Sequence, residues 1–214
     1  MDKKIADIRK EYSMQTLLEK DVAQDPFVQF DKWWNEAIQS ELEEINAMTL
    51  ATATLNGMPS ARIVLLKSVT QDGFMFFTNY NSQKGKELLE NPNACLVFFW
   101  KELERQIRIS GSVEKISAVE SDEYFVSRPE GSRIGAWASP QSSVIVSRDV
   151  IEENRLKYRQ QFTGGNINRP PHWGGYILRP TVIEFWQGRP DRLHDRIRFK
   201  LNEMSVWKTE RLAP

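Results

Sequence analysis

The sequence contains very little cysteine and histidine. Its 214 residues include one cysteine, Cys95, and two histidines, His172 and His194. A single cysteine cannot close an internal disulfide, and the apolar run 94–100 around it predicts a buried thiol. Two distant histidines and one cysteine have no spacing typical of zinc ligands, so we expect no metal site. His172, beside two prolines, is expected to be structural or exposed.

Net charge and long hydrophobic runs are also missing. The 29 Lys and Arg residues equal the 29 Asp and Glu residues, so the formal net charge is zero. Without excess basic charge or a basic stripe, a nucleic-acid partner is not expected. No apolar run approaches the length of a membrane span, and the first residues are charged, which predicts a cytoplasmic protein without a membrane partner. No repeat or low-complexity linker interrupts the chain, so we expect one domain over residues 1–214.

The apolar pattern predicts a mainly β protein with helices inserted between strands. Asp25 and Pro26 form a helix start, and apolar residues follow at helical spacing to Leu42. Further helices are expected at 82–90, 117–127 and 149–162, and strands at 49–55, 60–67, 74–78, 94–100, 105–115, 175–178, 182–187, 196–201 and 205–210. Short strands with irregularly inserted helices favour an antiparallel β-barrel decorated with α-helices, a mainly β member of the α+β class.

The predicted strand 60–67 carries two cations, Arg62 and Lys67. Side chains alternate along a strand, so these two cations leave opposite faces. One interpretation is that they serve two different anions, one on each side. The alternative is that both are solvated ends of a buried strand.

The second candidate site follows the strand 74–78. Thr78 ends this strand, and Ser82, Gln83 and Lys84 open the next helix. Hydroxyls, free N–H groups at a helix N-terminus and a lysine are the donors that a phosphate needs. A capped helix with a surface lysine would show the same pattern.

The third candidate site surrounds Arg128. Tyr124 lies four residues earlier and projects from the same face of a helix end. Arg128 and Ser132 can converge with Tyr124 on a phosphate, the arginine giving a bidentate fork. Gln141 and Ser142 add neutral donors. The stretch 129–143 is interpreted as a loop, either the wall of a site or a plain polar connection.

The fourth candidate site lies near the C-terminus. Arg192 and Arg196 flank His194, and their charges are expected to lower its pKa and keep the ring neutral. Trp186 offers a flat surface for a ring, and Gln106 on a middle strand supports the cluster. This set suits an anionic ligand that contains a ring.

Together these segments resemble the pyridoxine (pyridoxamine) 5′-phosphate oxidase family, FMN enzymes of the split-barrel class. The resemblance runs from about residue 8 to residue 214 and rests on several motifs. These are Arg-Ile-Val-Leu-Leu-Lys at 62–67, Phe-Phe-Thr-Asn at 76–79, Ser-Arg-Pro at 127–129, Ile-Gly-Ala-Trp at 134–137, Gln-Ser-Ser at 141–143, Trp-Gly-Gly at 173–175, Glu-Phe-Trp-Gln-Gly at 184–188 and Arg-Leu-His-Asp-Arg at 192–196.

The resemblance implies a role for each matching residue. FMN would be bound by Arg62, Ile63, Val64, Leu65, Leu66, Lys67, Phe77, Thr78, Gln83, Lys84, Gln106, Gln141, Ser142, Trp186 and Arg196. The substrate would be bound by Arg9, Tyr12, Lys67, Tyr124, Arg128, Ser132, Arg192, Leu193 and His194. Arg192 and His194 would be the catalytic residues, and residues 1–24 a flexible N-terminal lid.

The implied activity is conversion of pyridoxine or pyridoxamine 5′-phosphate to pyridoxal 5′-phosphate. Hydride would pass from C4′ to N5 of FMN, and O₂ would reoxidise the flavin to give H₂O₂. The resemblance also implies a homodimer with FMN between the subunits. Gln83 departs from the arginine found in many family members, which would weaken FMN binding by about 1–3 kcal/mol if nothing replaces it. A split-barrel flavoprotein with another substrate, or a non-catalytic FMN or pyridoxal phosphate binder, is the alternative.

Overall fold

The computed structural model describes residue 5 and residues 10–214. Arg9, which the resemblance assigns to the substrate site, lies outside the described residues. The chain divides into two compact units. Unit 1 combines the described part of 1–49 with 95–110 and 180–214, and unit 2 combines 50–94 with 111–179. The expectation of a single domain with an N-terminal lid stays a prediction.

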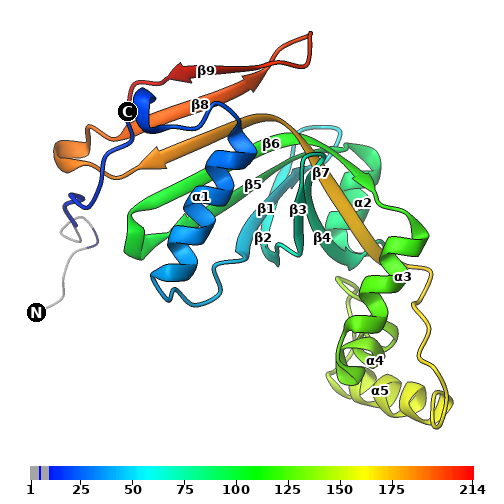
Figure 1. The fold of residues 1–214 in the computed structure, drawn as a ribbon. Helices are drawn as coiled ribbons and strands as arrows, with labels where there is room; N and C mark the ends of the chain where they lie inside the picture. The colour runs from blue at the N-terminus through cyan, green and yellow to red at the C-terminus, as the bar shows by residue number, and fades with distance from the viewer. Residues whose placement is uncertain (1–4, 6–9) are drawn as a thin grey trace, which may run out of the picture. The chain divides into compact units, whose positions relative to one another are not determined.

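Nine strands and five α-helices make up the regular structure of the described residues (Figure 1). The strands are β1 (Ala47–Ala53), β2 (Pro59–Leu65), β3 (Ser68–Thr70), β4 (Gly73–Asn79), β5 (Asn93–Trp100), β6 (Arg105–Lys115), β7 (Trp173–Gln187), β8 (Asp195–Leu201) and β9 (Trp207–Arg211). The helices are α1 (Pro26–Gln39), α2 (Gln83–Glu90), α3 (Ala118–Ser127), α4 (Glu130–Ala138) and α5 (Asp149–Gln161). The strands pair in the order β2-β1-β5-β6-β7-β4-β3, and β8 joins β7 to β9.

Helix α1 packs one apolar face within unit 1. Asp25 caps it by accepting the backbone N–H groups of residues 27 and 28, as the sequence predicts. Trp33 meets Phe185 of β7 edge to face at 5.2 Å, and Phe30 meets Phe98 of β5 at 5.6 Å. These contacts place the aromatic residues of α1 in the core of the unit.

Unit 2 is held by the antiparallel pair β4 and β7 and by a helical cluster. The register places Thr78 opposite Gly174 and Phe77 opposite Gly175. A Cβ at Gly174 would lie 2.1 Å from the hydroxyl oxygen of Tyr80, so any larger residue would have to displace the Tyr80 side chain. Helices α3, α4 and α5 gather at one end of the unit (Figure 1), where Phe125 is fully buried.

The structure confirms an antiparallel sheet with added helices and most predicted boundaries to within a few residues. No helix was predicted for the stretch that forms α4, whose glycines and serine have low helix propensity. Tertiary packing forms it: Ile134 is buried, and Trp137 contacts Tyr158 and Phe162 near α5. The short strand β3 was also missed.

Two further expectations were wrong. The predicted break between strands 175–178 and 182–187 does not occur, and β7 continues through Pro180. This proline lies between the residues paired with β4 and those paired with β8, where its missing N–H costs neither ladder a bond. Cys95 is half-buried rather than buried, and its Sγ lies 3.6 Å from the carbonyl oxygen of Leu96.

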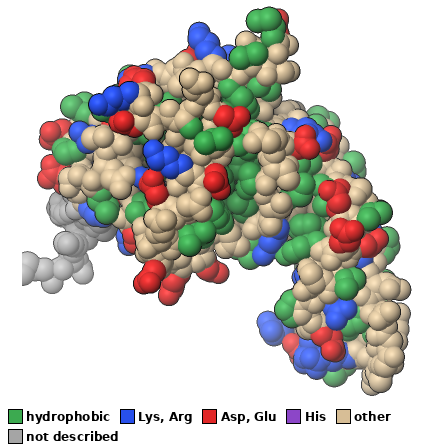
Figure 2. All heavy atoms as spheres, in the orientation of Figure 1, with side chains coloured by type: hydrophobic (Ala, Val, Ile, Leu, Met, Phe, Trp, Pro, Cys, Tyr) green, Lys and Arg blue, Asp and Glu red, His purple; other side chains and the backbone are tan. Residues whose placement is uncertain are grey.

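The surface agrees with the balanced composition. Acidic and basic side chains are interspersed on the face shown in Figure 2, without a single-sign field. Among the residues that the structure describes, none of the helices is long and apolar enough to cross a membrane.

Candidate active site

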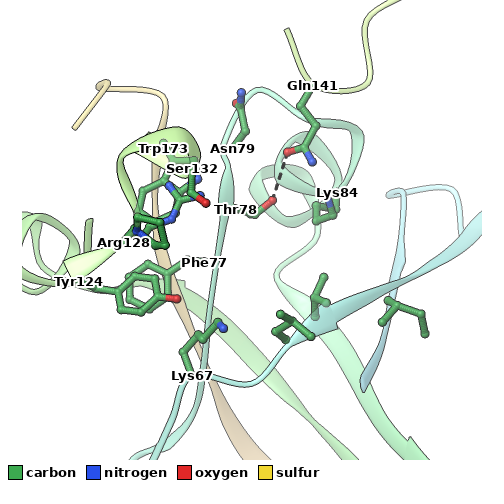
Figure 3. A pocket seen from close by; sticks show the side chains of 14 residues that line it. Lys67, Phe77, Thr78, Asn79, Lys84, Tyr124, Arg128, Ser132, Gln141 and Trp173 are labelled. Atoms are coloured by element: carbon green, nitrogen blue, oxygen red, sulfur yellow. Dashed lines mark hydrogen bonds between the residues drawn. The ribbon is translucent and has the colours of Figure 1, made fainter. Parts of the chain in front are cut away.

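A cavity of about 470 Å³ lies in unit 2 (Figure 3). It brings together predicted residues from β2, β4, α2, α3, α4 and the loops beside them, namely Ile63, Val64, Leu65, Lys67, Phe77, Thr78, Lys84, Tyr124, Arg128, Ser132 and Gln141. Asn79, Pro129 and Trp173 complete its lining. Figure 3 shows Arg128, Ser132 and Tyr124 on one side of the cavity and Lys84 and Gln141 on the other.

On one side of the cavity, Arg128 lies against a stack of aromatic side chains. Phe77 stacks on Tyr124 with 3.9 Å between ring centroids and on Trp173 with 5.5 Å. The guanidinium carbon of Arg128 lies 4.4 Å from the centroid of a Trp173 ring. Nη1 of Arg128 is buried and has no hydrogen-bond partner among the described residues. Burial lowers the pKa of this arginine, although the nearby Tyr124 opposes the shift. A buried donor without an acceptor is costly, which favours an anionic ligand here.

The opposite side has the donors of a helix N-terminus. Ser82 caps α2 by accepting the N–H of Gly85, so Lys84 occupies the first turn. Lys84 is only 8% exposed. Burial lowers its pKa first, and the positive charge of Arg62 lowers it further. The hydroxyl of Thr78 bonds to Gln141 at 3.5 Å. This side therefore suits a second anion.

The buried carboxylate of Glu87 binds Arg62. Oε2 of Glu87 lies 3.2 Å from Nη2 of Arg62 and accepts the hydroxyl of Ser60 at 2.6 Å. Its Oε1 accepts Nε2 of Gln83 at 2.9 Å. Burial alone would raise the pKa of Glu87, but hydrogen bonds from Ser60, Thr52 and Gln83 and the charge of Arg62 lower it to about 2. Strand β2 ends at Leu65, before Lys67; Lys67 lines the cavity and Arg62 pairs with Glu87, and the expectation that the two cations serve two different anions stays a prediction.

The C-terminal cluster lies in unit 1. The His194 ring is 4.6 Å from the ring of Trp186, and its Nδ1 accepts the backbone N–H of Arg189 at 3.1 Å. Arg192 is exposed and sits in a left-handed backbone conformation with φ of 62°. Tyr12 meets both rings edge to face, at 5.8 Å from Trp186 and 6.0 Å from His194.

The pKa of His194 is lowered, as the sequence predicts, but one expected cause was wrong. Burial is the main cause, and the charge of Arg192 adds to it. Arg196 is not one of these causes; its guanidinium bonds to Glu184 at 2.9 Å and to the carbonyl oxygen of Ala213 at 2.8 Å.

The remaining predicted residues are dispersed. Leu66 is buried in unit 2, and Ser142 lies on an exposed turn with φ of 70°. Leu193 is exposed and Gln106 is half-buried, both in unit 1. Sequence reasoning missed Trp173, Asn79 and Glu87. The first two lie in motifs already noted, whereas no sequence signal marks Glu87 as the partner of Arg62.

Comparisons with known proteins match nearly the whole chain. A family model described as "Pyridoxamine 5′-phosphate oxidase" matches residues 34–162, and "Pyridoxine 5′-phosphate oxidase C-terminal dimerisation region" matches residues 173–214. A pyridoxine/pyridoxamine 5′-phosphate oxidase of Cupriavidus metallidurans is 58% identical, over 98% of this chain and 99% of the relative. One from Nostoc punctiforme is 55% identical over the full length of both.

Solved structures agree with these matches. The crystal structure of PhzG from Burkholderia lata, in complex with tetrahydrophenazine-1-carboxylic acid, has a TM-score of 0.88 and 32% identity and covers 94% of this chain and 100% of its own. A pyridoxamine 5′-phosphate oxidase-related, FMN-binding protein of Nostoc punctiforme shares the fold with a TM-score of 0.69 at 18% identity, covering 86% of this chain and 97% of its own. The chain therefore has a split-barrel fold and belongs to a class of oxidoreductases. The chain belongs to the pyridoxamine 5′-phosphate oxidase family.

Proposed function

We propose that this protein is an FMN-dependent oxidase that converts pyridoxine or pyridoxamine 5′-phosphate to pyridoxal 5′-phosphate. The single observation that carries the substrate assignment is the buried, unpartnered Nη1 of Arg128 in the cavity wall. Ser132, Tyr124 and Lys67 line the same cavity and add two hydroxyls and an ammonium group. This donor set suits a phosphate, and the relatives named above carry a matching substrate in their names.

The residues on the opposite side fit the phosphate of FMN. Lys84 is buried at the N-terminus of α2, where the helix dipole favours an anion. Glu87 holds Arg62 and Gln83 beside the same helix turn. Thr78 and Gln141 add neutral donors to the cavity. The two ends of the cavity thus fit two phosphates, one from the cofactor and one from the substrate.

The residues of this chain position the substrate, provide positive charge for its phosphate and exclude water. Bound FMN would supply the two-electron oxidation of the substrate at C4′, with O₂ as the final electron acceptor. Arg128 and Lys67 hold the substrate phosphate, while the Phe77, Tyr124 and Trp173 stack keeps water from that end. Arg192 orients the pyridine ring and its substituents, and the neutral imidazole of His194 contacts the same ring.

A homodimer with FMN at the subunit interface belongs to the same proposal. The match of residues 173–214 to a dimerisation region supports it. The FMN residues implied by the family resemblance fall in both units: Lys84 and Gln141 lie in unit 2, and Trp186 and Arg196 in unit 1. A dimer allows residues of two protomers to share one cofactor.

Anaerobic addition of pyridoxine 5′-phosphate to the FMN-reconstituted protein tests the proposal. Bleaching of the visible flavin absorbance, with recovery in air and formation of pyridoxal 5′-phosphate, is the expected result. A bound flavin that stays oxidised would refute the substrate while leaving the cofactor in place. Unphosphorylated pyridoxine is the matched control, because the Arg128 side recognises the phosphate.

A further inference from the structure

Glu104 is a buried acid that holds the backbone of the segment 10–14. Its side chain is 3% exposed, and its Oε1 lies 3.3 Å from Nζ of Lys10. Its Oε2 accepts the backbone N–H of Ser13 at 2.8 Å and that of Met14 at 3.1 Å. Burial alone would raise the pKa of Glu104, but the two backbone hydrogen bonds and Lys10 lower it. The carboxylate is therefore ionised near neutral pH.

Tyr12 lies directly before the two residues that Glu104 binds. Its ring contacts Trp186 and His194 edge to face. A Cβ at Gly188 would lie 2.7 Å from Cγ of Tyr12 and 3.0 Å from Cβ of Glu104. The Tyr12 ring and the Glu104 side chain thus pack against the same residue, Gly188, which has no side chain. The N–H of Gly188 also donates to the carbonyl oxygen of Glu104 at 2.7 Å.

Other hydrogen bonds hold this part of the chain at Gln15 and Leu17 rather than at residues 13 and 14. The N–H of Leu17 donates to Asp195 at 3.0 Å, and Arg189 donates to the carbonyl oxygen of Gln15 at 3.2 Å. Among the described contacts, those of Glu104 are the ones that bind the backbone of residues 13 and 14. Without them, two donors lose their acceptor and the backbone beside Tyr12 gains conformational freedom.

We propose that Glu104 is a positioning residue for Tyr12, holding its ring against Trp186 and His194 where the substrate ring is bound. This inference rests on the proposed function and on the substrate contact that the family resemblance implies for Tyr12. When residues 10–14 are released, substrate binding must also order Tyr12. The loss of conformational entropy weakens binding, so KM rises. Turnover of bound substrate changes little, because Tyr12 takes no part in hydride transfer.

Glu104→Leu tests this, because leucine fills a similar volume and offers no oxygen to accept the N–H groups of Ser13 and Met14. We expect KM for pyridoxine 5′-phosphate to rise roughly tenfold, with kcat within about twofold of the wild type. Glu102→Leu is the matched control, because Glu102 is an exposed acid on the same turn. Gly188→Ala displaces the Tyr12 ring without removing the charge, so its KM should also rise. Tyr12→Ala should add little to the KM of Glu104→Leu, whereas independent effects would multiply and overturn the proposal.

Hydrogen exchange, measured without cofactor or substrate, tests this proposal independently of the proposed function. Amide hydrogen exchange at Ser13 and Met14 should be at least about tenfold faster in Glu104→Leu than in the wild type, because leucine offers no acceptor to either N–H. Unchanged exchange at both amides would overturn the proposal. If the wild type fails to oxidise pyridoxine 5′-phosphate, the proposed function fails. Faster exchange together with altered Trp186 fluorescence in Glu104→Leu would still support the positioning of Tyr12.

Discussion

The guanidinium carbon of Arg128 lies over Trp173, 4.4 Å from a ring centroid. This cation–π contact holds the arginine beside the indole. The buried Nη1 of the same side chain has no acceptor among the described side chains and backbone groups. A lysine at this position would lose the planar guanidinium and its bidentate fork.

Arg128→Ala should raise KM for pyridoxine 5′-phosphate by roughly 10- to 100-fold with little change in kcat, because a charge-assisted contact to the phosphate is lost. Arg128→Lys should recover only part of this loss. Steady-state kinetics measure both, with the exposed Arg148→Ala as the control. An unchanged KM in Arg128→Ala would remove Arg128 from the substrate site.

Arg192→Ala should lower turnover by roughly 100-fold, as expected when a residue that orients the substrate ring is removed. The dissociation constant of FMN should stay within about twofold of the wild type, because the change removes no contact that we assign to the cofactor. Stopped-flow flavin reduction and FMN fluorescence titration measure the two quantities. Loss of flavin with normal turnover per bound flavin would contradict this role for Arg192.

The same substitution should raise the pKa of His194. The charge of Arg192 is the second cause of its lowered pKa, after burial, so removing that charge makes the imidazolium easier to form. The pKa should stay below the ordinary value of 6.5 because burial remains. NMR titration of the two histidines, assigned with a His172→Gln variant, gives the answer. A downward shift would mean that Arg192 does not act on the ring through its charge.

Glu87 should make stability depend on acid pH. Its pKa is about 2 in the folded protein against 4.5 as the ordinary value, so its contribution is present above about pH 4.5 and is lost as the pH falls toward 2. Glu87→Gln should lower the free energy of unfolding at pH 7 and flatten its decline over that range. Urea unfolding between pH 2.5 and pH 7 measures this, with the exposed Glu90→Gln as the control. Equal pH dependence in all three proteins would rule out Glu87 as the source.

Gln83→Arg should tighten FMN binding by roughly tenfold, because it adds a cation beside Lys84. A cation at the first turn of α2 opposes the helix dipole, so stability should fall by about 0.3–1 kcal/mol. FMN and riboflavin titrations compared side by side isolate the phosphate contribution. A parallel change for riboflavin, which has no phosphate, would argue against a phosphate contact.

Sequence patterns predicted the unit 2 cavity better than the ion pairs around it. Tyr124, Arg128 and Ser132 were expected to converge because Tyr124 and Arg128 are four residues apart at a helix end, and all three line one cavity. The Glu87 pairing joins residues 25 positions apart, so no local pattern indicates it. The same holds for Glu184, which binds Arg196 from 12 positions earlier in the chain.

The backbone fold was predictable where local signals agreed with packing. The Asp25 cap and the predicted strand 105–115 were both confirmed. Helix α4 could not be predicted, because contacts with distant aromatic residues outweigh its weak local preference.

The bond from the Arg189 N–H to Nδ1 of His194 decides which tautomer the imidazole adopts. Nδ1 can accept this bond only when it carries no proton, so the single proton of the neutral ring resides on Nε2. The free nitrogen of the ring is therefore a hydrogen-bond donor. In its resting state it can hold a phenolate or carbonyl oxygen of a ligand, and it cannot take a proton from a substrate alcohol.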